Sequence, residues 1–208
     1  MGVVYFLCCK TILMVVMYGI AVLLCKWWTL NSVATMREVH STVSLSQGSG
    51  IFFMFTVEKT CSCFGHSDVE ITDELTARTR IEIDRAVADD VRIFLFGGRS
   101  DFDDLCYDLV TEKKNANPQL NIKRVFCFAL DKQLRKPPSW FVRKEYEALE
   151  CPTKDFDYWY TAIYYRNLAM IDQSDLILFW VEERENSGAY KTYRYAIKKH
   201  KRIVNLFT

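Results

Sequence analysis

Residues 92–105 read Arg-Ile-Phe-Leu-Phe-Gly-Gly-Arg-Ser-Asp-Phe-Asp-Asp-Leu, and this stretch decides the fold. Its first half is an apolar run rich in β-branched and aromatic residues, which is typical of a strand buried on both faces. Gly97 and Gly98 end the run, and an amphipathic segment follows over residues 102–114. Strand, glycine turn and helix start are the parts of a phosphate-holding loop, because the free N–H groups of a first helical turn carry partial positive charge.

The polar residues of this turn extend that interpretation. Arg99, followed by Ser100, offers a planar two-pronged donor to a phosphate, and Asp101 or Asp103 either caps the helix or accepts a hydrogen bond from a ribose hydroxyl. Paired glycines also let the backbone come close to a ligand. The same residues suit an ordinary strand-to-helix turn with a capping aspartate and a solvated arginine, so both interpretations stay open here.

Composition sets bounds on the class of protein. The chain has 208 residues, 50% of them hydrophobic, and a formal net charge of +1, which is enough for one domain with a proper core. The near-zero charge gives no electrostatic case for nucleic-acid binding. The eight cysteines are scattered and form no disulfide pattern, which favours a reducing, cytoplasmic compartment. Cys61-x-Cys63-x-x-His66 has no second ligand pair at suitable spacing, so no metal site is expected.

Residues 3–30 form a mostly apolar segment with several interpretations. Its uninterrupted part, residues 11–25, is short for a membrane span of about 20 residues, although Trp27 and Trp28 would anchor it at the interface. Such an anchor would leave the domain in the cytoplasm, and membrane association is expected only if the segment is native. A signal-peptide core with cleavage near Ala34 is the second interpretation.

The third interpretation, which we favour, is a translated leader that is not part of the native protein. Residues 31–53 look featureless, and residues 47–50, Gln-Gly-Ser-Gly, can be encoded by a purine-rich run of the kind that precedes bacterial start codons. Met54 is then the candidate start. In every interpretation residues 1–53 are an apolar segment and linker, and residues 54–208 form the domain.

Apolar runs alternate with amphipathic segments through the domain. Strands are expected over residues 60–64, 91–96, 122–129, 175–181 and 202–207. Helices are expected over residues 72–88, 102–114, 161–171 and 188–199. The first helix is expected to bury Leu75, Ile81, Ile83 and Val87. Residues 131–157 are expected to form a variable connection with a short helix near residues 142–149.

This alternation predicts an α/β fold, a three-layer Rossmann-like parallel sheet of about five strands with helices on both faces. Ligands bind such sheets beyond the carboxyl ends of the strands, near the point where strand order reverses. The loops over residues 65–67, 97–103 and 182–188 are therefore expected to form the site.

Further candidates for ligand contact lie at the last helix and within the one before it. Ser187 and Gly188 open the last helix and offer a second set of free N–H groups, although a serine cap with a glycine for close packing also explains them. Arg166 and Asn167 lie in mid-helix, where asparagine is unfavourable unless its side chain is used. A buried hydrogen bond to residues 131–157 is the alternative.

Catalysis would need a carboxylate or a histidine at the reacting bond. The candidates are His66, Asp101, Asp103 and Glu185. His66 follows Gly65 at the end of the first strand, and we interpret it as a ligand-facing turn residue. A general base and a turn residue bonded to the backbone are its alternatives.

Four motifs follow one another along the domain: Cys63-Phe64-Gly65-His66, Phe96-Gly97-Gly98-Arg99-Ser100-x-Phe102-Asp103-Asp104-Leu105-Cys106, Arg166-Asn167-x-x-Met170-Ile171-Asp172-x-Ser174-Asp175 and Asn186-Ser187-Gly188. In this order they resemble the YpsA-like branch of the SLOG superfamily, which joins the DNA-processing protein A and Lonely Guy Rossmann-like domains. The resemblance spans about residues 59–207, nearly the whole domain.

The resemblance implies a domain that binds a nucleotide or a nucleotide-derived ligand such as an adenine nucleotide, ADP-ribose or an NAD-like molecule. Two departures matter. Ser67 stands where an arginine commonly follows the Gly-His pair, and Thr192 stands where Lonely Guy phosphoribohydrolases carry their catalytic glutamate. We therefore expect a sensor that passes its state to a protein partner or to a second copy. An enzyme that cleaves an N-glycosidic or phosphate bond is the alternative.

Overall fold

The computed structural model describes residues 13–17, 20–24, 39–44, 52–98, 100–141, 145–153 and 158–207. The chain divides into two compact units, Met1–Ala34 and Thr35–Thr208. In the first unit β1 (Leu13–Met17) pairs antiparallel with β2 (Ile20–Leu24). No helix in the described part of the chain is long and apolar enough to cross a membrane.

The second unit begins with another antiparallel pair, β3 (Val39–Ser44) and β4 (Phe52–Val57). The expectation that residues 31–53 are featureless was therefore wrong, because these residues include β3 and the start of β4. The expected domain start, Met54, lies inside β4.

The main sheet has six parallel strands in the order β10-β9-β5-β6-β7-β8. Its strands are β5 (Lys59–Gly65), β6 (Val91–Phe96), β7 (Lys123–Cys127), β8 (Ala148–Glu150), β9 (Leu176–Trp180) and β10 (Arg202–Asn205). The helices of this unit are α1 (Asp73–Ala88), α2 (Asp101–Ala116), the 3-10 turn η1 (Pro118–Leu120), α3 (Asp131–Arg135), α4 (Trp159–Gln173) and α5 (Gly188–Lys198). The α/β Rossmann-like architecture predicted from the sequence is confirmed.

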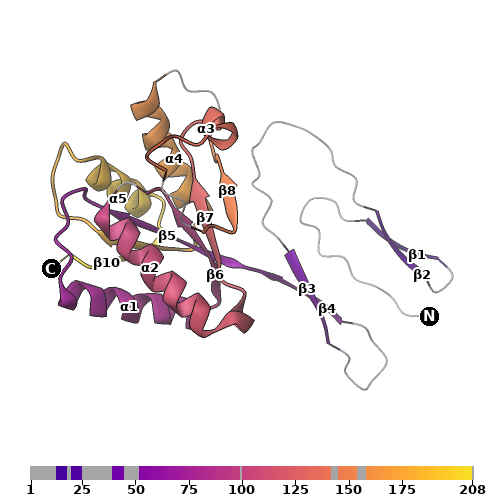
Figure 1. Cartoon of the computed structure of the whole chain (residues 1–208). Helices are drawn as coiled ribbons and strands as arrows, with labels where there is room; N and C mark the ends of the chain where they lie inside the picture. The colour runs from indigo at the N-terminus through magenta and orange to yellow at the C-terminus, as the bar shows by residue number, and fades with distance from the viewer. Residues whose placement is uncertain are drawn as a thin grey trace. The chain divides into compact units, whose positions relative to one another are not determined.

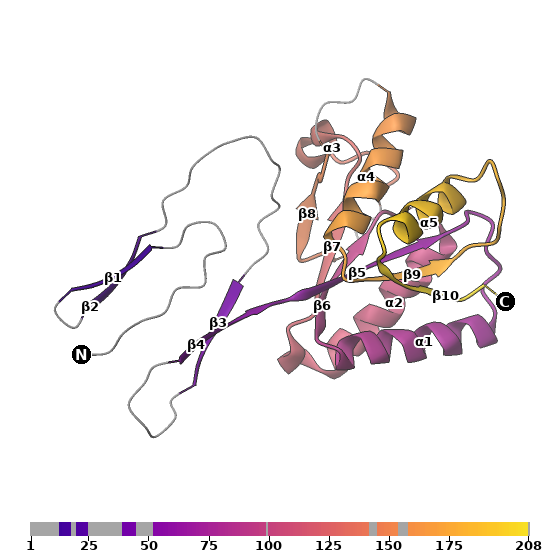
Figure 2. The same cartoon turned by 180° about the vertical axis from the view of Figure 1, so that it is seen from behind.

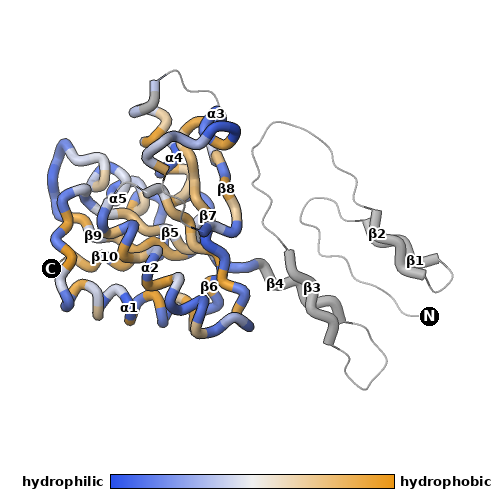
Figure 3. The backbone as a smooth tube through the Cα atoms, in the orientation of Figure 1, coloured by the Kyte–Doolittle hydropathy of each residue, from blue (hydrophilic) through white to orange (hydrophobic). Residues whose placement is uncertain are grey.

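Helices cover both faces of this sheet. Successive side chains of a central strand point to opposite faces, and apolar side chains on both faces have to be covered. Phe94 and Phe96 of β6 pack in the hydrophobic cluster that includes α1 and α2, whereas Leu95 packs in the cluster that includes α4 and α5. Figure 1 looks onto α1 and α2, and Figure 2, from behind, looks onto α4 and α5. Hydrophobic residues are concentrated along the strands between these layers (Figure 3).

Side-chain hydroxyls cap three of the helices. Thr72 Oγ1 accepts a hydrogen bond from Leu75 N at 3.1 Å at the start of α1, and Ser100 Oγ accepts one from Asp103 N at 3.1 Å at the start of α2. Ser187 Oγ caps α5 in the same way. Each such cap stabilises its helix by about 1 kcal/mol. The caps fix where each helix begins. Because α2 follows β6 and α5 follows β9, the starts of both helices lie at the carboxyl edge of the parallel sheet.

The structure also differs from the sequence-based expectations within the domain. Residues 148–150 form β8, a sixth strand, where the end of a short helix near residues 142–149 was expected; residues 142–144 lie outside the described residues. The connection also contains α3, which was not predicted. Ile81 was expected to face the core but is 50% exposed, because the core face of α1 is formed by Leu75, Ile83 and Val87.

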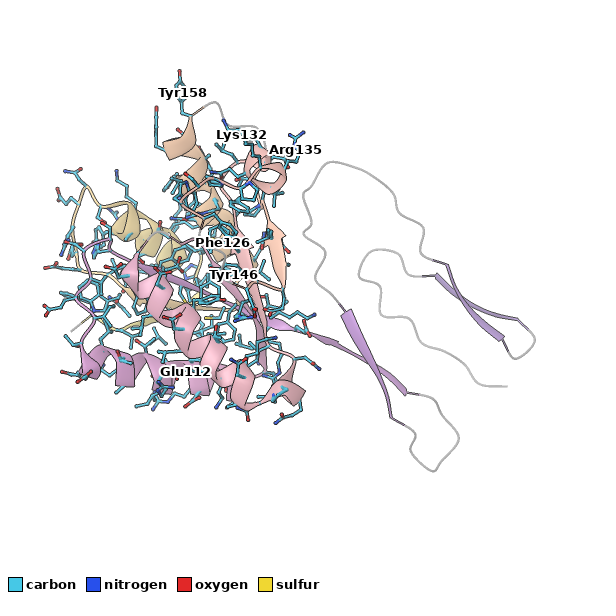
Figure 4. All side chains as sticks on the ribbon, in the orientation of Figure 1. Glu112, Phe126, Lys132, Arg135, Tyr146 and Tyr158 are labelled. Atoms are coloured by element: carbon cyan, nitrogen blue, oxygen red, sulfur yellow. The ribbon has the colours of Figure 1, made fainter. Side chains whose placement is uncertain are left out.

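Aromatic rings fill the space between α2 and the β7–β8 edge. Phe126 and Tyr146 lie with ring centroids 5.2 Å apart, and Figure 4 shows the two side chains side by side in this layer. An ion pair joins β7 to the residue before β8, because Arg124 Nη2 lies 2.8 Å from Glu147 Oε1. Burial alone would raise the pKa of the Glu147 carboxyl, but hydrogen bonds from Arg124 lower this pKa to about 2.

Candidate functional site

A cavity of about 250 Å³ opens at the carboxyl ends of β5, β6 and β9. Strand order reverses at β5, which has β6 on one side and β9 on the other. Gly65 pairs with Trp180 at the ends of β5 and β9, so the loops after both strands start at one edge. Most of the predicted site residues line this cavity: Gly65, His66, Gly97, Ser100, Asp103, Arg166, Asn167, Ser187 and Gly188.

Three of the other predicted residues, Gly98, Asp101 and Glu185, do not line the cavity. Arg99 lies outside the described residues. Asp101 and Glu185 are exposed, and Gly98 lies behind the turn against Phe126. The cavity also includes residues that the sequence reasoning missed, notably Ile163 and Ala189. Ile163 lies one helical turn before Arg166 and Asn167, so the i, i+3, i+4 spacing of α4 would have predicted it.

The glycine turn after β6 is closed by a side chain of the protein itself. Asp103 is buried, and its Oδ2 accepts hydrogen bonds from the backbone N–H groups of Gly97, at 3.1 Å, and of Gly98. Two amides that converge on one carboxylate oxygen form an anion-binding nest. In this domain the nest already holds an anionic group, so these two amides do not point at a ligand.

The glycines at this edge allow close packing within the chain. A Cβ on Gly97 would lie 2.6 Å from Arg166 Nη2, and one on Gly65 would lie 2.6 Å from Phe102 Cβ. Gly98 has a φ of +61°, and its Cβ would lie 2.8 Å from the Phe126 ring. Gly188 differs, since a Cβ there would meet nothing within 4 Å. Among the described glycines that line the cavity, Gly188 is therefore the one where a side chain could be added without a clash.

Arg166 and Asn167 act as a unit in α4. Arg166 is buried and donates through Nη1 to Gly97 O at 2.9 Å and to Cys127 O at 3.3 Å. It also donates to Asn167 Oδ1, from Nε at 3.1 Å and from Nη2 at 2.8 Å. Because a guanidinium only donates, the facing atom of Asn167 is its oxygen, and the Asn167 NH₂ group is turned the other way. Asn167 is also one of the residues that line the cavity.

His66 connects the loops after β5 and β9. It is buried, and its Nε2 lies 3.0 Å from Glu182 N and 3.1 Å from Glu182 O. Its Nδ1 lies 3.0 Å from Ser187 Oγ, which also accepts a hydrogen bond from Tyr190 N at 3.3 Å. Further out, Arg184 Nη1 lies 2.8 Å from Asp68 Oδ2 and joins the same two loops at the surface.

Thr192, which stands in place of the Lonely Guy glutamate, is also buried. Its hydroxyl donates to Gly188 O at 2.8 Å, so the side chain bonds to the backbone of α5. The hydroxyl is thus bonded within α5, and the side chain presents no carboxylate.

Cys63 is a buried thiol that lines the cavity, and Cys61 and Cys106 belong to the same hydrophobic cluster. A hydrogen bond with Cys106, together with burial, holds the pKa of the Cys63 thiol well above its ordinary value. Burial likewise raises the pKa of Cys61 and of Cys106. These groups therefore stay neutral near pH 7 and are poor nucleophiles and metal ligands. Within the described ranges no three His, Cys, Asp or Glu residues are grouped so that they would hold a metal ion.

Comparison with known proteins assigns no family. No protein-family model matches the chain, and no curated protein matches it. A function for this domain therefore has to be argued from the fold and the cavity.

Proposed function

We propose that the domain binds a nucleotide or nucleotide-derived ligand in this cavity and acts as a sensor. The observation that carries the proposal is the set of hydrogen-bond donors around the cavity at the point where strand order reverses. The donors are the N–H groups of Gly188 and Ala189 in the first turn of α5, the hydroxyls of Ser100 and Ser187, and the NH₂ group of Asn167. A donor-rich lining suits a ligand rich in acceptors, such as a phosphate ester.

Within the cavity we place the phosphate at the start of α5. The first turn of α2 carries Asp101, Asp103 and Asp104, and Asp103 fills the nest of the glycine turn, so a phosphate there would meet negative charge. The first turn of α5 carries no acidic residue. Asp103, the aspartate of α2 that lines the cavity, instead suits a hydroxyl of a ribose, which is one of the roles that the sequence suggested for Asp101 or Asp103.

A sensor is favoured over the alternative hydrolase by the placement of the acid–base candidates. Asp103 is tied to two backbone amides, and His66 is tied to Glu182 and Ser187. Asp101 and Glu185 are exposed and do not line the cavity. None of the four is held against the cavity in the way that a general acid or base requires.

An exposed tyrosine surface on α4 supports signalling to a protein partner or to a second copy. Tyr158, Tyr160 and Tyr165 are 63%, 59% and 44% exposed, and Figure 4 shows Tyr158 pointing outward at the end of the domain. Tyrosine is enriched in protein interfaces. The same helix carries Arg166 and Asn167 into the cavity, so ligand contacts and this surface share one rigid element. The four sequence motifs and the Rossmann-like parallel sheet lead us to propose that the domain is a member of the SLOG superfamily, close to its YpsA-like branch, and the scattered cysteines favour a cytoplasmic location.

Isothermal titration calorimetry of the full chain with AMP, ADP-ribose and NAD tests the proposal. Gly188→Leu would extend a side chain into open space at the cavity and is expected to weaken binding by more than about tenfold without lowering the melting temperature. Ala77→Leu, the same kind of enlargement on the exposed side of α1, is the matched control. If none of the three nucleotides binds, the proposal is wrong. If the nucleotide binds and is recovered cleaved, the hydrolase alternative replaces the sensor.

A further inference from the structure

The hydrogen bonds of His66 determine which of its ring nitrogens carries the proton. The imidazole is 4% exposed, and each ring nitrogen lies within hydrogen-bonding distance of a neighbour. A neutral imidazole has one N–H donor and one acceptor nitrogen, so the partners of the two nitrogens decide between two tautomers.

Glu182 N decides the tautomer. A backbone N–H can only donate, and that of Glu182 points at Nε2 from 3.0 Å. If Nε2 carried the proton and donated to Glu182 O at 3.1 Å, two hydrogens would face each other and the Glu182 amide would lose its acceptor. Leaving such an amide unpaired is costly. Nε2 is therefore the acceptor, and the proton lies on Nδ1.

The protonated Nδ1 then acts on Ser187. Nδ1–H donates to Ser187 Oγ at 3.0 Å, and Tyr190 N–H donates to the same oxygen at 3.3 Å. A hydroxyl oxygen accepts two hydrogen bonds, so both lone pairs are used. The hydroxyl proton of Ser187 is not used in these two bonds. Because Ser187 lines the cavity, this proton can be donated to a ligand.

We infer that His66 is a positioning residue that fixes the Ser187 hydroxyl as a donor to the ligand, so that the group bound at the start of α5 must be an acceptor, such as a phosphate oxygen. This inference rests on the proposed function and refines its ligand class to phosphate-bearing nucleotides over their nucleosides. The opposite tautomer would make Nδ1 the acceptor of the Ser187 proton, which is the arrangement of a nucleophile and its base. The tautomer therefore also distinguishes a donor serine from a nucleophilic one.

Nitrogen-15 NMR of the histidine side chains measures the tautomer without any ligand. The chain has three histidines, and the signals that disappear in His66→Gln belong to His66. We expect the Nδ1–H tautomer of His66 at pH 7.5. The Nε2–H tautomer, or a rapidly exchanging mixture, would overturn the inference whether or not the protein binds nucleotides.

Two substitutions of His66 separate its two hydrogen bonds. In His66→Asn the side-chain NH₂ group takes the place of Nδ1–H, whereas in His66→Gln the amide oxygen takes the place of Nε2 and the donor to Ser187 is lost. We expect His66→Asn to bind AMP within about threefold of wild type and His66→Gln to bind it about tenfold more weakly, the loss expected for one hydrogen bond. If both variants bind AMP equally weakly, the hydrogen bond from His66 to Ser187 does not position the hydroxyl, and His66 has only a structural role.

Ser187→Ala and a nucleoside control complete the test. Ser187→Ala is expected to weaken AMP binding at least as much as His66→Gln does, while Thr72→Ala removes a comparable helix cap far from the cavity and leaves AMP binding unchanged. Adenosine, which lacks the phosphate, is expected to bind wild type and His66→Gln with equal affinity. Tighter binding of adenosine than of AMP to wild type would contradict the assignment. Failure of every nucleotide to bind would refute the proposed function alone, since the tautomer is measured separately.

Discussion

Replacing Asp103 by asparagine tests how the glycine turn is built. The carboxylate accepts hydrogen bonds from the amides of Gly97 and Gly98, and hydrogen bonds to a charged group contribute about 1.5–3 kcal/mol each. Asparagine keeps one acceptor oxygen but loses the charge, which about halves the strength of such bonds. We therefore expect Asp103→Asn to lower the free energy of unfolding by about 2–3 kcal/mol.

Urea unfolding followed by circular dichroism, with the full chain, measures this loss. For a domain of this size the loss corresponds to a fall of about 5–10 °C in melting temperature. Asp101→Asn is the matched control, because Asp101 is exposed in the same helical turn, and it is expected to cost about 0.5 kcal/mol through the helix dipole. A loss in Asp103→Asn no larger than that of Asp101→Asn would refute the claim that this carboxylate holds the turn.

Three further predictions concern other parts of the domain. Glu147→Gln is expected to lower stability by about 1–2 kcal/mol at pH 7, because the carboxyl is 29% exposed and its ion pair is partly screened. Since the pKa of Glu147 is lowered from 4.5 to about 2, its contribution is complete above pH 4.5 and disappears as the pH falls toward 2, so unfolding curves of wild type and variant should converge there. Gly65→Ala is expected to lower the melting temperature by several degrees because its Cβ would overlap α2, whereas Gly188→Ala should leave it within about 2 °C; equal effects would contradict the packing described. Among the described cysteines, Cys151 should react first with an alkylating reagent and Cys63 only on unfolding, as peptide mapping would show; early labelling of Cys63 would contradict its burial.

The sequence was sufficient for the layers of the fold. Apolar runs of five to seven residues and hydroxyl caps such as Thr72 and Ser187 mark the strands and helix starts, and their alternation leads to a parallel sheet. The short strand β8 escaped prediction because three residues, with Leu149 41% exposed, carry no periodic signal. Ile81 was misplaced because the helical period was not applied: it stands two residues before Ile83 and therefore on the opposite side of α1.

The convergence of the candidate loops was also predictable, since parallel strands direct all their carboxyl ends to one edge. Which backbone amides at this edge are available to a ligand was not predictable. Three contacts decide how the amides are used. The Asp103 carboxylate folds back across the turn onto the amide of Gly97, Arg166 packs against Gly97 from a distant helix, and His66 contacts Ser187 from a distant loop. No local spacing encodes them, so the sequence suggested a phosphate at the glycine turn, whereas the proposal places it at α5.

Amide chemical-shift changes in the ¹⁵N-labelled full chain on titration with AMP test the central claim most directly. A phosphate bound at the start of α5 is expected to shift the amide signals of Gly188 and Ala189 most, and to leave those of Gly97 and Gly98, which bond to Asp103, nearly unchanged. Saturating AMP that shifts neither Gly188 nor Ala189, or that shifts Gly97 and Gly98 instead, would contradict the account.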